Sequence, residues 1–104
     1  MTTSRIRRTD SVSDDAVGPT MRAGDVADAV IDAIEQDNPG REVLVTDRGD
    51  HVHVHVLNDC RLTRASLEQH LGRDYALPML EIEMASFAGR LQTSDAEYRW
   101  YFKN

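Results

Sequence analysis

Residues 51–57 read HVHVHVL, and this alternating stretch decides the fold. Successive side chains of a β-strand point to opposite faces, so the pattern predicts a strand with one apolar and one polar face. We expect Val52, Val54 and Val56 to pack in the core and the histidines to lie in solvent. The preceding run REVLVTD (41–47) is typical of a strand, and the three residues between predict a turn. The centre of the chain is therefore expected to be a β-hairpin.

Helical patterns flank this hairpin on both sides. The first helix is expected to begin with Asp25 as its N-cap and to end before Pro39, because proline disfavours a helical conformation in the residue before it. A short strand over 17–22 precedes it. The second helix is expected to have Thr63 as its N-cap and Gly72 just beyond its end, after the run RASLEQHL.

The last third of the chain predicts strands. A short helix is expected to begin at Pro78, and LEIEMASFAGRLQT (80–93) predicts a long strand interrupted by a bulge or bend at its small residues. The run YRWYF (98–102) predicts the closing strand. Its core-facing residues are expected to be Tyr98, Trp100 and Phe102.

The order of these elements predicts an α+β fold. It runs strand–helix–strand–strand and then repeats in weaker form, so we expect two βαββ-like halves packed in one compact domain over 17–104. Residues 1–16 are rich in Ser, Thr and Asp, and they lack the apolar surface that would offset the entropy of ordering. They are expected to form a mobile N-terminal tail, either solvated or ordered on a partner.

Composition excludes several classes of function. The 104 residues carry 18 acidic and 12 basic side chains, a formal net charge of −6 that argues against a nucleic-acid partner. No apolar run is long enough to span a membrane, and the start lacks the apolar core of a secretory signal. Cys60 is the single cysteine, so no intramolecular disulfide can form. These features predict a cytoplasmic protein.

The chain offers no self-sufficient catalytic motif. Cys60 has the anionic Asp59 beside it, which makes it a poor nucleophile, and neither GxSxG nor a glycine-rich phosphate loop occurs. His51, His53 and His55 share one strand face, but no HExxH or CxxC pattern supports a metal site. We therefore expect no catalytic residues, no cofactor and no metal. A small histidine-rich metal-binding domain and a generic α+β interaction module remain open as alternatives.

Four ordered runs carry a family resemblance: VGPTMRAGD (17–25), DNPGREVLVTDR (37–48), LTRASLEQHLGRDY (62–75) and LEIEMASFAGRLQ (80–92). Together they resemble the effector, or coupling, proteins of bacterial multicomponent diiron monooxygenases, nearest the toluene and alkene branch. The resemblance implies a cofactor-free, non-enzymatic component that binds the hydroxylase near its active site. It further implies coupling of NADH-derived electron transfer to hydroxylation or epoxidation of an aromatic or alkene hydrocarbon.

The same resemblance implies partners and contact residues. The partner would be the diiron hydroxylase oligomer, with functional coupling to a Rieske-type ferredoxin, an NADH reductase or both. The segment EMASFAGR (83–90) would face the hydroxylase, with Phe87 as an apolar anchor. The family implies no role for the three histidines. The residues expected at the hydroxylase contact are Glu83, Ala85, Ser86, Phe87, Gly89, Asn38 and Arg48.

Overall fold

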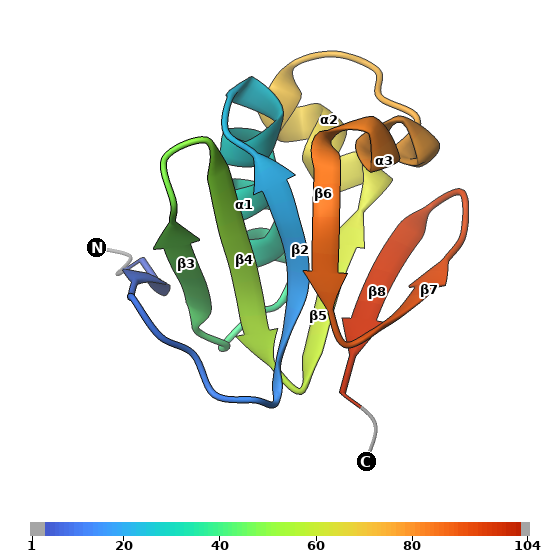
Figure 1. Cartoon of the computed structure of the whole chain (residues 1–104). Coiled ribbons are helices and arrows are strands. Elements are labelled where there is room, and N and C mark those ends of the chain that lie inside the picture. The colour runs from blue at the N-terminus through green and yellow to red at the C-terminus, as the bar shows by residue number, and fades with distance from the viewer. Residues whose placement is uncertain (1–3, 103–104) are drawn as a thin grey trace.

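The computed structural model of this chain describes residues 4–102, so residues 1–3 and 103–104 of the predicted tail and domain lie outside it (Figure 1). Helices and strands mix in one globule, which confirms the predicted α+β class. In chain order the elements are β1 (Ile6–Arg8), β2 (Ala16–Arg22), α1 (Asp25–Asp37), β3 (Val43–Asp47), β4 (His51–Leu57), β5 (Asp59–Thr63), α2 (Arg64–Leu71), the 3₁₀ turn η1 (Leu77–Met79), α3 (Leu80–Glu83), β6 (Met84–Ala88), β7 (Arg90–Thr93) and β8 (Glu97–Tyr101).

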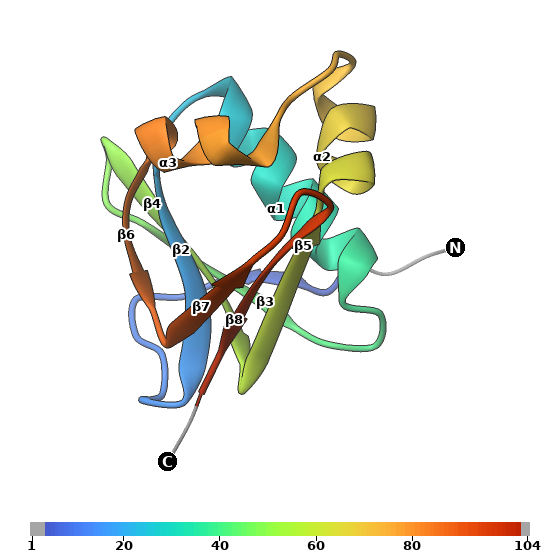
Figure 2. The ribbon, with the colours of Figure 1, turned by 90° about the vertical axis from the view of Figure 1, so that its right-hand side faces the viewer.

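The strands form two sheets. The larger sheet has the order β1-β3-β4-β2-β6, and the smaller has the order β5-β8-β7. The first half of the chain is the expected β2-α1-β3-β4 unit, whereas the second half divides, because β6 pairs with β2 of the first half. Helices α1 and α2 lie together on one side of the larger sheet, and the smaller sheet stands beside β6 (Figures 1 and 2). No helix within residues 4–102 combines the length and apolar character needed to cross a membrane.

The predicted hairpin lies at the centre of the larger sheet. Val52, Val54 and Val56 are all buried, as the alternation predicted, and they pack with the apolar side of α1 in one core. Helix α1 begins where expected, but Gly24 is its N-cap and Asp25 is its first helical residue, which corrects the predicted cap. The carboxylate of Asp25 still lies in the first turn, where it interacts favourably with the helix dipole.

The second helix follows its predicted capping residues. The Thr63 side chain accepts a hydrogen bond from the Ser66 N–H, which satisfies one of the helix's unpaired donors. Gly72 takes a left-handed conformation with φ of 75°, and its N–H donates to the Glu68 carbonyl. Both ends of α2 are therefore fixed by residues that the local sequence identifies.

The end of α1 is joined to β5 by one buried amide. Asn38 Nδ2 donates to the carbonyl oxygens of Ile34 (2.7 Å) and Arg61 (2.8 Å). Asn38 Oδ1 accepts a hydrogen bond from the Arg61 N–H at 3.0 Å. We call this set of contacts the Asn38 joint. It adds a second hydrogen bond to the Ile34 carbonyl, which also accepts the Asn38 backbone N–H, and it links the helix to the smaller sheet.

Part of the predicted tail takes regular structure. Strand β1 adds to the edge of the larger sheet, parallel to β3. Arg5 Nη1 donates to the carbonyls of Asn38 (2.6 Å) and Arg41 (3.1 Å), and Nη2 donates to the carbonyl of Glu35 (2.7 Å). These contacts correct the expectation that residues 1–16 lack structure. Composition missed them because every partner lies far away in sequence; mobility of the segment remains a prediction.

The expected long strand from Leu80 is divided in the structure. Leu80–Glu83 is helical and continues the 3₁₀ turn η1, so only the later part of the predicted strand is extended. Leu77 and Leu80 are fully buried three residues apart, a helical spacing that leaves Ile82 in solvent. The hydroxyl of Tyr98 donates to Glu81 at 3.0 Å, which ties α3 to β8. The strand that the alternation of Leu80, Ile82 and Met84 predicted was therefore wrong for residues 80–83, which are helical.

Two other C-terminal predictions have mixed outcomes. The predicted bulge is confirmed, because Thr20 pairs with Ser86 but Met21 pairs with Met84, so that Ala85 is the extra residue. Tyr98 and Trp100 are buried in the core as expected. Phe102 is 39% exposed, which corrects its predicted core position, since β8 ends one residue earlier.

Candidate docking surface

The segment that joins η1, α3 and β6 exposes unusually much apolar surface. Among the described residues five large hydrophobic side chains are exposed, and three of them lie in this segment. They are Met79 (51% exposed), Ile82 (74%) and Phe87 (45%). Exposed apolar side chains that gather in one region indicate a contact with a partner. The sequence prediction included Phe87 but missed Met79 and Ile82, which the helical spacing of Leu77 and Leu80 could have placed outside the core.

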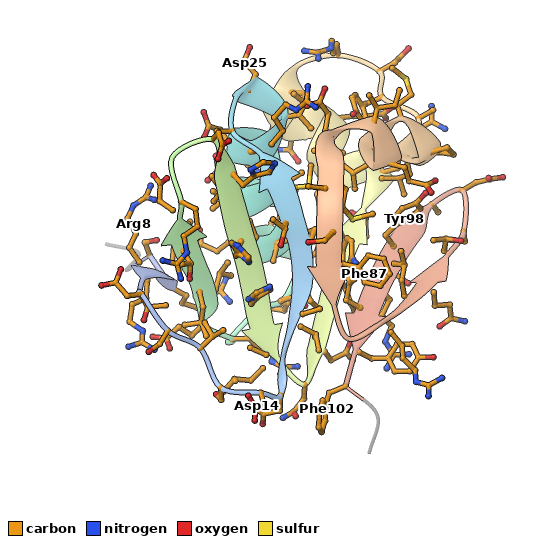
Figure 3. The ribbon with its side chains drawn as sticks, viewed as in Figure 1. Arg8, Asp14, Asp25, Phe87, Tyr98 and Phe102 are labelled. Carbon is orange, nitrogen blue, oxygen red and sulfur yellow. The ribbon has the colours of Figure 1, made fainter. Side chains whose placement is uncertain are left out.

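Strand β6 presents its side chains at the edge of the larger sheet. Ser86 lies opposite Thr20 and points away from α1, whereas Phe87 lies opposite Pro19. The bulge at Ala85 separates this pair from α3. Figure 3 shows the Phe87 ring beside β6, on the side toward β8. No further strand pairs with β6 among residues 4–102, and the side chains of Ser86 and Phe87 are both exposed.

Contacts within the fold require a glycine at position 89. Its φ is +91°, and a Cβ atom there would lie 2.6 Å from Val17 Cγ1 and 2.8 Å from the Tyr101 carbonyl oxygen. Both distances are shorter than a side chain tolerates, so glycine is required where the chain passes from β6 to β7. Gly89 had two possible explanations, a close approach to a partner or a bend in the chain, and the structure supports the bend.

The other expected contact residues divide in the same way. Asn38 is 4% exposed and the described hydrogen bonds of its side chain all lie within the Asn38 joint, which corrects its placement at a partner contact. Arg48 is exposed in the turn between β3 and β4, and two strands separate β3 from β6. At normal strand spacing this puts it roughly 14 Å from β6. Glu83 is half-buried at the end of α3, next to the exposed segment.

The histidines of β4 differ strongly from one another. His51 and His53 are half-buried, and His53 Nδ1 lies 3.1 Å from the Thr20 hydroxyl. Burial lowers the pKa of His53, and the charges of Arg48 and His51 lower it further. We therefore expect His53 to be mainly neutral at pH 7.

His55 is buried, which corrects its predicted place in solvent. It is 5% exposed, its ring lies 5.7 Å from that of His53, and neither ring nitrogen has a hydrogen-bond partner among the described residues. Burial lowers its pKa to about 4, with a smaller contribution from His53. A neutral imidazole at pH 7 follows, because a charged one would be buried without a counterion. No group of three or more His, Cys, Asp or Glu in residues 4–102 is placed to hold a metal.

The single cysteine is buried, and the charged groups that line the main hollow are paired with one another. Cys60 is fully buried, and its burial together with the charge of Asp59 raises the pKa of the thiol far above its usual value. A hollow of about 380 Å³ on the smaller sheet is lined by two ion pairs, Arg61–Glu97 (2.6 Å) and Arg99–Asp59 (2.9 Å). These charges neutralise each other, so the hollow presents little unpaired charge to a ligand.

This α+β scaffold, with its exposed η1–α3–β6 segment, belongs to a known class of regulatory proteins. The chain is a member of the MmoB/DmpM family, which it matches over residues 15–101. The resemblance noted in the sequence is thereby confirmed at the level of the family. Its named relatives are effector or regulatory components of monooxygenase systems, a non-catalytic role.

Particular relatives share both sequence and fold. The chain is 58% identical over 95 residues to the effector subunit of the alkene monooxygenase system of Xanthobacter autotrophicus (strain ATCC BAA-1158 / Py2), covering 91% of this chain and 94% of that protein. A structure of the phenol hydroxylase–regulatory protein complex contains a chain with a TM-score of 0.71 at 19% identity, covering 85% of this chain and 98% of that one. The soluble methane monooxygenase regulatory protein B gives a TM-score of 0.62 at 17% identity, covering 93% and 71%. The two structures show the shared fold.

Proposed function

We propose that this chain is the effector component of a multicomponent diiron monooxygenase and that it acts by binding the hydroxylase near its active site. The observation that carries the proposal is the 58% identity to an alkene monooxygenase effector subunit over nearly the full length of both chains. The exposed segment with Met79, Ile82 and Phe87 supports it, because a protein without its own catalytic motif acts through contacts.

The proposed contact is centred on β6. Phe87 is the apolar anchor, since aromatic side chains contribute most to interface energies, and Ile82 adds apolar area from α3. Ala85 and Ser86 are small and exposed, so a partner can approach the backbone of β6 closely. Glu83 and Arg48 are proposed at the margin of this contact, whereas Gly89 contributes by fixing the bend behind it.

The proposed effect on the hydroxylase is a shift between its conformational states. An effector can change an equilibrium only if it binds one state more tightly than another, so docking beside the active site must be state-selective. In the proposed scheme this selectivity couples NADH-derived electrons, delivered by a reductase, a Rieske-type ferredoxin or both, to oxygenation of the substrate. The identity of the relative favours an alkene as substrate over an aromatic hydrocarbon. We place the complex in the cytoplasm.

Reconstitution tests this function directly. Hydroxylase, reductase and ferredoxin from the cognate system are assayed with and without the chain, and product is measured per NADH consumed. We expect the chain to raise both the rate and the product formed per NADH. An unchanged rate, coupling and regiospecificity with the cognate hydroxylase would rule out the proposed function.

A further inference from the structure

The larger sheet has one face that helices leave open. Figure 1 looks onto the face opposite α1, where β3, β4 and β2 stand uncovered, and Figure 2 shows α1 and α2 on the other side. Backbone register aligns Thr46, His53, Thr20 and Ser86 in one row across β3, β4, β2 and β6. Ser86 therefore belongs both to the proposed β6 contact and to this open face. The two surfaces are continuous.

The open face is polar at its centre and carries two arginines, Arg22 and Arg48, at one end. Thr20 and Thr46 are buried, whereas His53 is half-buried and Ser86 is exposed. Beyond this row, Arg22 pairs with His51 in the register, and the Arg48 N–H donates to the carbonyl of His51. Arg48 is also close enough to His53 for its charge to lower the pKa of that imidazole.

Carboxylates are absent from the outward strand positions of this face. The outward-facing residues of the described strands are Arg7, Ala16, Gly18, Thr20, Arg22, Leu44, Thr46, His51, His53, His55, Leu57, Ser86 and Ala88. Two acids outside the strands, Asp50 and Glu42, pair with the outward residues His51 and Arg7, and the Asp10 carbonyl accepts a hydrogen bond from Arg48. The absence of carboxylates from the outward strand positions is unusual for a chain with 18 acidic residues.

Three exposed acids lie on the opposite side of the molecule, along α1. Asp25, Asp28 and Asp32 are all exposed on α1, and Figure 3 shows Asp25 at the end of that helix. An acidic partner surface would be repelled by the helical side and attracted by the open face. The distribution of charge therefore selects one orientation of docking.

We propose that the open face, defined by Thr20, Arg22, Arg48, His53 and Ser86, extends the β6 contact and binds a carboxylate-bearing patch on the hydroxylase. This inference rests on the proposed function, and it adds the orientation of the chain and the chemistry of the opposing surface. Guanidinium groups donate hydrogen bonds but accept none, and Arg48 spends one donor on the Asp10 carbonyl at 3.4 Å, so a partner that pairs with the remaining donors of the two arginines must supply acceptors. Carboxylates supply those acceptors and the complementary charge.

A matched pair of charge reversals tests the proposal. Arg22→Glu changes the open face, and Arg73→Glu changes an exposed arginine beside α1 and α2; each takes the formal net charge from −6 to −8. Hydroxylase affinity is measured by calorimetry at about 0.05 M and about 0.5 M salt, after thermal melting confirms that both variants are folded. We expect Arg22→Glu to raise the Kd about tenfold or more at low salt, and Arg73→Glu to change it less than about twofold. The difference should shrink at high salt, where charges are screened within roughly 4 Å.

Each outcome decides between the proposals. Equal effects of the two variants, with normal binding by the unchanged chain, overturn the open-face contact and leave the proposed function intact. Failure of the unchanged chain to bind its cognate hydroxylase overturns both. A change in self-association caused by Arg22→Glu without any change in hydroxylase affinity would assign the face to contacts between copies of this chain, which also overturns the inference.

Discussion

The Asn38 joint and the β6 contact contain residues that the sequence analysis placed together at the hydroxylase contact. In the structure Asn38 is buried, whereas the residues of β6 are exposed. The Asn38 amide is buried and makes three hydrogen bonds to the backbone of its own chain. Ser86 and Phe87 are exposed on an edge strand. A buried side chain whose polar groups are already hydrogen-bonded inside the fold is not available to bind a partner, whereas the exposed side chains of β6 are available.

This difference separates two kinds of substitution. Changes within the interior should lower the free energy of unfolding and leave the hydroxylase affinity of the folded fraction unchanged. Changes on β6 should do the reverse, because exposed side chains contribute little to folding.

Gly18→Ala should be the most destabilising change. A Cβ there would lie 2.0 Å from the carbonyl oxygen of Val54, and backbone of the central strand cannot move aside. We expect a loss of about 4 kcal/mol in the free energy of unfolding, measured by urea denaturation. Gly24→Ala is the matched control, because Gly24 has nearly the same φ but nothing within 4 Å of the added atom. Equal losses for the two would assign the effect to φ alone.

Asn38→Ala should break the Asn38 joint. It removes the described partner of the Arg61 carbonyl and of the Arg61 N–H, and it leaves the Ile34 carbonyl with only the backbone N–H of residue 38, so we expect about 3 kcal/mol of destabilisation. Gln92→Ala removes an exposed amide of the smaller sheet and should cost less than about 0.5 kcal/mol. Affinity for the hydroxylase, measured where the variant is fully folded, should equal that of the unchanged chain. Weaker binding under those conditions would return Asn38 to the contact surface.

His55 should make the fold sensitive to acid. Its folded pKa of about 4 lies below the ordinary value of 6.5, so the unfolded chain binds more protons between these values. Stability is therefore lost as pH falls from about 6.5 toward 4. One pKa unit corresponds to about 1.4 kcal/mol, and with allowance for solvent screening we expect a loss of roughly 2 kcal/mol by pH 4.5.

Substitution isolates this effect. The neighbours of His55 on the adjoining strands, Leu44 and Gly18, carry no charge, so His53 is the titrating group that faces it. His55→Leu should remove most of the acid-dependent loss in urea denaturation at pH 7 and pH 4.5, whereas His51→Gln should retain it. An acid profile that is unchanged in His55→Leu would place the sensitivity elsewhere.

Phe87→Ala should have the smallest effect on stability and a clear effect on docking. We expect less than about 0.5 kcal/mol of destabilisation, because the ring is 45% exposed, but a roughly tenfold rise in the hydroxylase Kd. Phe102→Ala is the control: its ring is similarly exposed and lies at the opposite end of the larger sheet from α3 (Figure 3). Ser86→Arg should weaken docking as well. Normal binding by both β6 variants would show that the contact lies elsewhere.

Much of the fold could be predicted from short stretches of the sequence. The alternation in β4 places its valines, Thr63 and Gly72 define the ends of α2, and the small residues near Ala85 indicate the bulge. Each signal lies within a few residues of its consequence. The exposed part of the candidate contact, centred on Phe87, followed from family resemblance, and its exposure is consistent with that role.

Other features depended on partners distant in sequence. The helical start of the 80–93 segment was missed because its apolar spacing fits a strand and a helix equally over so few residues. Arg5 contacts α1 thirty or more residues away, so composition alone classed it with a solvated tail. No local pattern could show that β6 leaves its own half of the chain to pair with β2.

The sequence by itself determined the two-faced strand HVHVHVL, the ends of α2 and the family, because backbone sterics, hydrogen-bond capping and ordered motifs act through neighbouring residues. Only the tertiary structure decided that Asn38 is structural, that His55 is buried while His53 is half-buried, and that the outward strand positions of one sheet face carry no carboxylate among the described residues. Burial and surface charge are properties of residues brought together by packing. The same alternating histidines therefore take different environments along a single strand.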